Sequence, residues 1–243
     1  MILVTGNGRL AKELEKLSTD TLPIITLSRR EMDITNEYMV SDVIKKFMIK
    51  PDFPKYLIHT AALTKPMDVN DRNPIMSMDT NVVGTANVAK VCSKYGIKFI
   101  YISTDFVYGD SSLVDENSEV KPSNNYGWSK LGGECSVKLY ENSLILRIAM
   151  MNKPILYPKA LTDVKRSLLF DEDAAKITLK LLDNFGTINV GYEPKSIYDF
   201  TKEHNPNVGK ISLSEVGDIK LPSNTSVNVG KMKKLLKNKE KDL

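Results

Sequence analysis

The fold is decided by the stretch Ile2-Leu3-Val4-Thr5-Gly6-Asn7-Gly8-Arg9-Leu10-Ala11, in which a short apolar run passes directly into a glycine loop and then into a helical pattern. Its spacing is GxGxxA, placed where a dinucleotide-binding fingerprint requires it. In such a loop one glycine turns the chain, another lets backbone N–H groups approach a pyrophosphate, and a small residue such as Ala11 lets the helix pack closely on the strand. The stretch therefore predicts a nucleotide-binding loop, with a simple tight turn as the alternative.

The same order of strand and helix repeats along the chain. Apolar runs predict buried strands at residues 2–4, 24–27, 56–58, 99–102, 144–148 and 188–190, and longer periodic patterns predict helices at 10–17, 37–49, 74–95, 126–140 and 172–182. This alternation is typical of an α/β fold with a doubly wound parallel sheet, covered by helices on both faces and open to ligands at the carboxyl ends of its strands. We predict a Rossmann-like dinucleotide-binding domain over residues 1–150.

The pattern weakens after Met150. Residues 152–164 contain two prolines and show no clear period, and Ser, Asn and Gly become frequent between residues 191 and 228. These features predict a small carboxyl-terminal substrate lobe over residues 151–243 that does not fold by itself. A basic, amphipathic helix is predicted at its end, over residues 231–241.

The composition argues against several classes of partner. The chain has 34 Lys and Arg against 30 Asp and Glu, a net charge of +4, and its basic residues are dispersed, so nucleic acid is not an expected partner. No apolar run approaches the ~20 residues that span a bilayer, and the segment before Gly6 lacks the basic start of a signal peptide, so we expect no membrane partner and a cytoplasmic location. Cys92 and Cys135 belong to no CxxC or Cys/His cluster. We expect both to be small buried side chains, and we expect no metal site.

The residues after the second predicted strand bear on the choice of cofactor. A protein specific for NAD usually carries an acidic residue there, whereas this chain reads Leu27-Ser28-Arg29-Arg30. Arginine suits a ribose 2′-phosphate, so Ser28, Arg29 and Arg30 predict a preference for NADP(H), with NAD(H) as the second choice. The alternative is that both arginines point into solvent.

Tyr126 and Lys130 are the strongest candidates for chemistry. Their i, i+4 spacing places them on one face of a predicted helix. A phenol titrates near pH ~10, so a neighbouring ammonium group would make it a better proton donor and acceptor at neutral pH. Thr104 follows a buried strand and could hold a carbonyl or hydroxyl oxygen while Tyr126 transfers a proton. Taken alone, each pattern also fits a solvated helix face or the polar cap of a turn.

Several motifs in order resemble the extended short-chain dehydrogenases/reductases, and most of all the dTDP-4-dehydrorhamnose reductase group. The resemblance covers about residues 1–147 and rests on the glycine loop, Asp33-Ile34-Thr35, His59-Thr60-Ala61-Ala62-Leu63-Thr64, Asn81-Val82-Val83-Gly84-Thr85, Ser103-Thr104-Asp105-Phe106-Val107-Tyr108-Gly109 and Tyr126-Gly127-Trp128-Ser129-Lys130-Leu131-Gly132-Gly133-Glu134. Several ordered motifs are far more specific than any one of them.

The resemblance implies a catalytic role for each matching residue. Tyr126 would protonate a sugar ketone, while Lys130 would lower the pKa of Tyr126 and hold the nicotinamide ribose. Thr104 would orient the ketone oxygen, and Asp105 would lie beside the substrate. Asn81 would support a proton relay, and a buried structural asparagine is the close alternative.

The resemblance also implies how a dinucleotide would bind and what would be reduced. The pyrophosphate would contact Gly6, Gly8, Arg9 and Leu10; the adenine would lie between Asp33 and Ile34; and the ribose and nicotinamide would lie against Ala61, Ala62 and Thr64. The expected reaction is NADPH-dependent reduction of a nucleotide-linked 4-keto-6-deoxy sugar. A homodimer is expected by analogy with the superfamily.

Two departures from the family pattern keep other functions open. The segment between Met150 and Phe170, which helps to enclose the sugar nucleotide in the family, is shorter here, and the glycine loop is one residue tighter than usual. A nucleotide-sugar epimerase of the same fold is one alternative. Dehydration is disfavoured because Asp105 stands where sugar dehydratases carry glutamate. A non-catalytic regulatory subunit that retains the nucleotide-binding fold is the other alternative.

Overall fold

The computed structural model describes residues 1–64, 68–217 and 220–239, which form one main sheet and a smaller β-rich lobe. The main sheet has the strand order β10-β6-β4-β3-β1-β2, with β9 paired to β6, and each pair is parallel. Its strands are β1 (Ile2–Thr5), β2 (Ile24–Leu27), β3 (Tyr56–His59), β4 (Lys98–Ser103), β6 (Ser143–Met151), β9 (Leu168–Phe170) and β10 (Gly186–Val190). The prediction of a doubly wound parallel sheet is confirmed.

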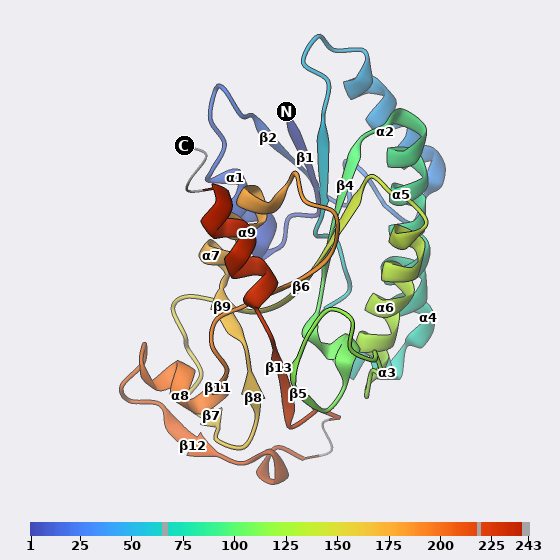
Figure 1. The fold of residues 1–243 in the computed structure, drawn as a ribbon. Helices are drawn as coiled ribbons and strands as arrows, with labels where there is room; N and C mark the ends of the chain where they lie inside the picture. The colour runs from blue at the N-terminus through green and yellow to red at the C-terminus, as the bar shows by residue number, and fades with distance from the viewer. Residues whose placement is uncertain (65–67, 218–219, 240–243) are drawn as a thin grey trace.

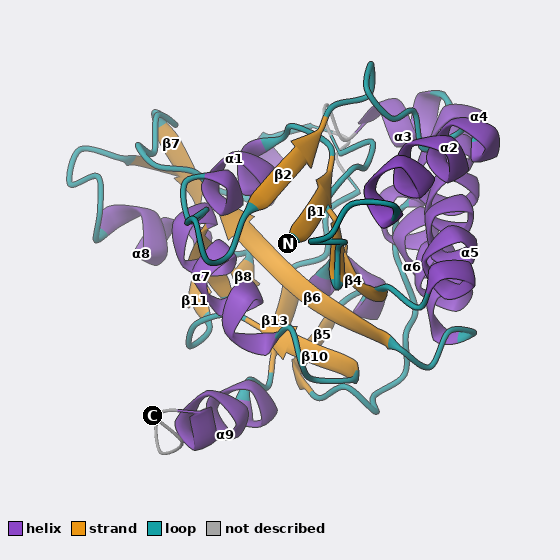
Figure 2. Ribbon diagram, turned by 90° about the horizontal axis from the view of Figure 1, so that it is seen from above, coloured by secondary structure: helices purple, strands orange, loops and turns teal. Residues whose placement is uncertain are grey.

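Helices cover both faces of this sheet (Figures 1 and 2). One face carries α2 (Glu37–Met48), α5 (Gly84–Tyr95) and α6 (Asn125–Lys138), and the other carries α1 (Arg9–Glu15), α7 (Asp171–Leu181) and α9 (Gly230–Lys239). The strand order reverses between β1 and β3, because β2 lies on one side of β1 and β3 on the other. Ligands of such sheets bind at this switch point, beyond the carboxyl ends of the strands.

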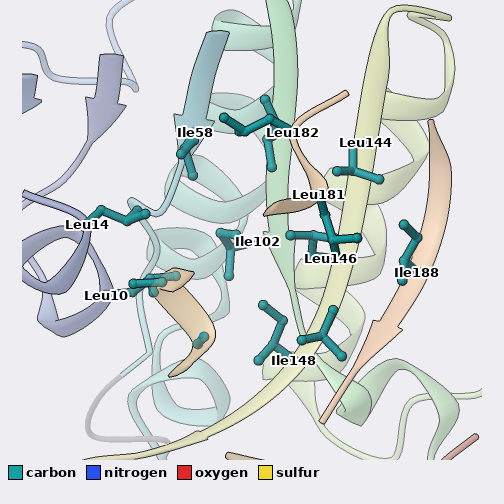
Figure 3. Close-up of a cluster of buried hydrophobic side chains, with 14 of the residues drawn as sticks. Leu10, Leu14, Ile58, Ile102, Leu144, Leu146, Ile148, Leu181, Leu182 and Ile188 are labelled. Carbon is teal, nitrogen blue, oxygen red and sulfur yellow. The ribbon is translucent and has the colours of Figure 1, made fainter. Parts of the chain in front are cut away.

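The strands are buried on both faces, which explains their continuous apolar sequences. Side chains of β6 alternate: Leu144, Leu146 and Ile148 join the cluster around α1 and α7, whereas Ile145 joins the cluster under α2 and α5. Figure 3 shows the first cluster, where these β6 side chains lie close to Leu181. Burial of each side chain of this size stabilises the folded state by about 1.5–3 kcal/mol relative to an exposed side chain.

The lobe lies below the carboxyl ends of the main strands (Figure 1). Its larger sheet has the order β11-β8-β13-β5, formed by β11 (Lys195–Ser196), β8 (Lys165–Arg166), β13 (Asn224–Val227) and β5 (Ser111–Val114), and a second sheet pairs β7 (Lys159–Leu161) with β12 (Gly209–Ile211) beside α8 (Ile197–Lys202). Strand β13 is thus hydrogen-bonded to β5 from the first half of the chain and to β8 from the second. The division at residue 150 stays a prediction, and β6 runs across it.

The segment predicted as one helix over residues 74–95 is three consecutive helices. It consists of α4 (Pro74–Ser77), a π-helical turn at Met78–Val83 and α5, and α3 (Asp68–Arg72) precedes them. The predicted carboxyl-terminal helix is α9, although residues 240 and 241 of that prediction lie outside the described residues. Cys92 is buried as expected, but the expectation was wrong for Cys135, which lies on the exposed side of α6. Within the described ranges, no helix has the length and hydrophobicity of a membrane span.

Candidate functional site

A cavity of about 470 Å³ lies at the switch point of the main sheet. The predicted site residues in its wall are Gly6, Gly8, Arg9, Leu10, Arg29, Asp33, Ile34, Ala61, Ala62, Thr64, Thr104, Tyr126 and Lys130. Four others, namely Ser28, Arg30, Asn81 and Asp105, lie outside this wall. Glycine loop, strand ends and α6 therefore meet around one space, although they come from distant parts of the sequence.

The glycine loop closes one end of this cavity. Gly6 has a φ of +87°, which favours glycine, and a Cβ there would stand 3.1 Å from the Ala61 backbone. A Cβ on Gly8 would meet no atom within 4 Å, so the loop opens into free space at this residue. Gly8 also precedes α1 without supplying a side-chain cap. The N–H groups of the first turn of α1 therefore lack a side-chain acceptor at Gly8.

The two arginines that follow β2 were both expected beside a 2′-phosphate, but only one of them lines the cavity. Arg29 lines the cavity and pairs with Asp33, at 3.1 Å between Nε and Oδ2, whereas Arg30 is exposed and outside the cavity wall. Burial by itself would raise the pKa of Asp33, but hydrogen bonds from Thr35 and the charge of Arg29 together lower it.

Ser28, which was expected to contact the cofactor, lies outside the cavity wall. Its backbone N–H and its hydroxyl both donate to Oε2 of Glu31, at 2.8 and 2.6 Å. The hydroxyl is therefore committed to a residue three positions later on the chain.

Tyr126 lies in the first turn of α6, which Asn124 caps by accepting a hydrogen bond from the Gly127 N–H at 2.8 Å. Burial and the charge of Asp105 raise the pKa of the Tyr126 phenol to about 12, while Arg166 and a hydrogen bond with Thr104 act in the opposite direction. The charge of Arg166 thus acts on the phenol. The expected effect of Lys130 on the pKa of Tyr126 stays a prediction.

Lys130 is buried one turn further along α6. Its Nζ lies 4.1 Å from the centre of the Tyr101 ring. Burial lowers the pKa of Lys130 to about 7, and the carboxylate of Glu134 only partly offsets this effect. The side chain therefore changes its charge near neutral pH, which an unperturbed lysine does not do.

Glu134 belongs to a buried network that fixes α6 on the sheet. Its carboxylate accepts two hydrogen bonds from Arg147 of β6, at 3.0 and 2.7 Å, and one from Ser103 of β4 at 2.6 Å. The network thus joins the helix that carries Tyr126 and Lys130 to the strand that precedes Thr104.

Asn81 lies within the π-helical turn and is completely buried. Its Oδ1 accepts from the Leu63 N–H at 2.7 Å, and its Nδ2 donates to the Leu63 carbonyl at 3.2 Å and to Ser129 Oγ at 2.9 Å. Asn81 therefore clamps the loop after β3 to α6 and does not reach the cavity.

Asp105 was expected beside the substrate, but the structure places it behind Arg166. Its side chain is 1% exposed and accepts hydrogen bonds from Arg166 Nη2 at 2.5 Å, Arg166 Nε at 2.9 Å and Thr225 Oγ1 at 2.5 Å. Arg166, which the sequence analysis missed, lines the cavity instead. No local signal marks it, because Arg166 reaches this position through the pairing of β8 with β13.

Comparison with known families decides the relationship of the chain. The family model described as "RmlD substrate binding domain" matches residues 1–176. The chain belongs to this family. The resemblance found in the sequence motifs is thereby confirmed.

Two curated relatives each match a little more than half of the chain. A dTDP-4-dehydrorhamnose reductase from Mycolicibacterium smegmatis is 30% identical over 56% of this chain and 41% of its own length. Methionine adenosyltransferase 2 subunit beta from Xenopus laevis is 32% identical over 55% of this chain and 40% of its own length. The chain thus spans less than half the length of either curated relative.

A solved structure matches the whole chain. The dTDP-4-dehydrorhamnose reductase of Bacillus anthracis, crystallised in complex with NADP, has a TM-score of 0.86 and 25% identity, covering 100% of this chain and 99% of that one. The smaller lobe is therefore part of the fold that the two chains share.

Proposed function

We propose that the chain is an NADPH-dependent reductase of a nucleotide-linked 4-keto-6-deoxy sugar, of the dTDP-4-dehydrorhamnose reductase type. The observation that carries the proposal is that Thr104, Tyr126 and Lys130 line the same cavity as the glycine loop. The reductase names of the Mycolicibacterium and Bacillus proteins support the same reaction.

The residues of the cavity fit a dinucleotide. Gly8 opens into free space, and a bulkier residue at Gly6 would press on Ala61, as the fingerprint requires. Arg29 in the wall favours NADP(H) over NAD(H), in keeping with the NADP in the Bacillus protein. The pyrophosphate would contact Gly6, Gly8, Arg9 and Leu10; the adenine Asp33 and Ile34; and the ribose and nicotinamide Ala61, Ala62, Thr64 and Lys130.

Each side chain near the substrate would have its own role in the transfer of hydride and proton. When bound, NADPH would supply the hydride. Thr104 would hold the ketone oxygen, and Tyr126, whose phenol is protonated at neutral pH, would give that oxygen a proton. Lys130 would then return a proton to Tyr126, since the pKa of its amine lies near 7. Asn81 would act on neither group directly but would hold α6 in register with the loop after β3.

The test is the loss of NADPH absorbance with a panel of nucleotide-linked 4-keto-6-deoxy sugars. The proposal expects turnover with at least one of them and a weaker response with NADH. Net oxidation of NADPH also excludes epimerisation, which returns the hydride to the substrate. A chain that oxidises NADPH with none of the ketones would contradict the proposal.

A non-catalytic subunit is the second candidate, because one relative of comparable identity is named as a subunit of methionine adenosyltransferase 2. This candidate predicts dinucleotide binding without turnover, so the same assay separates the two. A homodimer is also part of our proposal and would appear in light scattering as twice the 27.3 kDa mass of the chain.

A further inference from the structure

Arg166 lines the same cavity as Tyr126, but it belongs to none of the sequence motifs. It comes from β8 of the smaller lobe, and its guanidinium carbon lies 4.2 Å from the centre of the Phe106 ring. Phe106 in turn meets Tyr126 edge to face, with ring centres 6.1 Å apart. Arg166, Phe106 and Tyr126 all line the cavity. A cation from the lobe is thus stacked on the ring that packs against the proposed proton donor.

The carboxylate of Asp105 is buried and its hydrogen bonds are made mainly within the protein. Its Oδ1 accepts from Arg166 Nη2 and from Thr104 Oγ1, and its Oδ2 accepts from Arg166 Nε and from Thr225 Oγ1. A carboxylate offers about four lone-pair positions. Arg166 and Thr225 fill three of them, and the hydroxyl of Thr104 lies 3.1 Å from the fourth until it turns to the ketone oxygen. Asp105, which the family resemblance placed beside the substrate, is 1% exposed and is held mainly by Arg166 and Thr225.

The guanidinium of Arg166, in contrast, has donors to spare. It carries five N–H groups in a planar fork, and its bonds to Asp105 use one edge, formed by Nε and Nη2. Its side chain lines the cavity and is 15% exposed, whereas that of Asp105 is 2% exposed and lies outside the cavity wall. The group that faces a substrate beside Tyr126 is therefore a fixed hydrogen-bond donor in place of an acceptor.

We infer that Arg166 is a specificity-determining residue, which donates hydrogen bonds to an acceptor oxygen next to the carbonyl that Tyr126 protonates, and that Asp105 and Thr225 hold it in position. This inference rests on the proposed function. In a 4-keto-6-deoxy sugar the carbon on one side of the ketone bears the 3-hydroxyl, and that on the other side bears a methyl group and the ring oxygen. The ring oxygen is an ether joined to the carbon that bears the nucleotide phosphate, which makes it the weaker acceptor. We therefore assign the 3-oxygen as the acceptor that Arg166 contacts.

The experiment compares Arg166→Lys and Arg166→Gln with the wild type, on the parent ketosugar and on its 3-deoxy analogue. Losing a hydrogen bond to a charged group costs a factor of about 10 to 100, so we expect KM for the parent sugar to rise by that factor. On the 3-deoxy analogue the wild type should be equally weakened, and the two variants should match it. The affinity for NADPH, followed by nicotinamide fluorescence, should stay within about twofold.

A purely structural role for Arg166 makes a different prediction. If Arg166 served only to neutralise buried Asp105, the double variant Asp105→Asn/Arg166→Gln would recover the wild-type KM. We expect it to remain as impaired as Arg166→Gln. If the single variants do not fold, the wild type alone still tests the inference, because an unchanged KM for the 3-deoxy analogue would overturn it.

The outcomes separate this inference from the proposed function. Turnover by the wild type with unchanged kinetic constants in Arg166→Lys would overturn the role of Arg166 and leave the reductase intact. A wild-type chain that neither binds nor reduces any ketosugar would overturn both.

Discussion

Burial of Lys130 makes the stability of the protein depend on pH. The pKa of its amine falls from 10.5 to about 7 on folding, so between these values the unfolded chain binds a proton that the folded chain does not. The stability contributed by the neutral amine is present above pH 10.5 and is lost as the pH falls toward 7. The loss is at most about 1.4 kcal/mol per pH unit.

Lys130→Met has no amine that must lose a proton on folding, so its stability should not fall with pH for this reason. The free energy of unfolding of the variant relative to the wild type should therefore grow as the pH falls from about 9 to about 7, and stay constant below. Urea unfolding at a series of pH values measures it. Lys138→Met, on the exposed side of the same helix, is the matched control and should show no such trend. An equal offset at every pH for Lys130→Met would contradict the assignment.

Asn81 has a positioning role that stability measurements can test. Asn81→Ala removes the partner of the N–H and carbonyl of half-buried Leu63, and it removes one of the two hydrogen bonds of the Ser129 hydroxyl. Buried groups that lose their partner cost about 1–3 kcal/mol, so urea unfolding should show a loss in this range. Asn142→Ala removes a half-buried amide whose two hydrogen bonds are long, at 3.4 and 3.3 Å, and should change the stability by less than about 0.5 kcal/mol. Equal effects of the two substitutions would refute the clamp.

At the residue scale, sequence motifs located Thr104, Tyr126 and Lys130 but not their electrostatics. The spacing of Tyr126 and Lys130 fixes a shared helix face, whereas the pKa of each depends on burial and on charges far away in the sequence. Arg166 is 61 positions from Asp105 and could not be foreseen, because only the pairing of β8 with β13 brings the two together.

At the scale of elements, α6 is fixed by the buried pair of Glu134 and Arg147, whose side chains are 0% and 2% exposed. Glu134→Gln would leave a buried guanidinium without its counter-charge, and we expect a loss of about 3–5 kcal/mol in the free energy of unfolding. The double variant Glu134→Leu/Arg147→Met should be closer to the wild type, since it removes both charges. A double variant as unstable as the single one would show that packing, and not charge, dominates here.

Strands and long helices were predicted well because their signals are local. The run Ile24–Leu27 was predicted with its observed boundaries, and β1 and β3 each differ by one residue. The π-helical turn at Met78–Val83 was missed, since hydrophobic periodicity over residues 74–95 does not reveal one widened turn. The short strands β8 and β11, of two residues each, have no periodicity to read and exist only through their partners.

At the scale of the whole molecule, the lobe is joined to the segments that follow the main strands by strand pairing and hydrogen bonds. Strand β13 lies between β5 and β8, and Thr225 of β13 donates to Asp105 beside the cavity. We therefore expect a single cooperative unfolding transition, in which the fluorescence of Trp128, the one tryptophan of the chain, and the far-ultraviolet circular dichroism change together. Two steps in the dichroism with only one in the fluorescence would show that the lobe unfolds independently.

Tyr126 is proposed to protonate a carbonyl beside a bound dinucleotide. The most direct test of this role is NADPH oxidation by the wild type and by Tyr126→Phe with a nucleotide-linked 4-keto-6-deoxy sugar. Loss of a positioned proton donor should lower kcat about 100-fold to 10,000-fold, while the affinity for NADPH stays close to that of the wild type. Wild-type turnover in Tyr126→Phe would contradict the account.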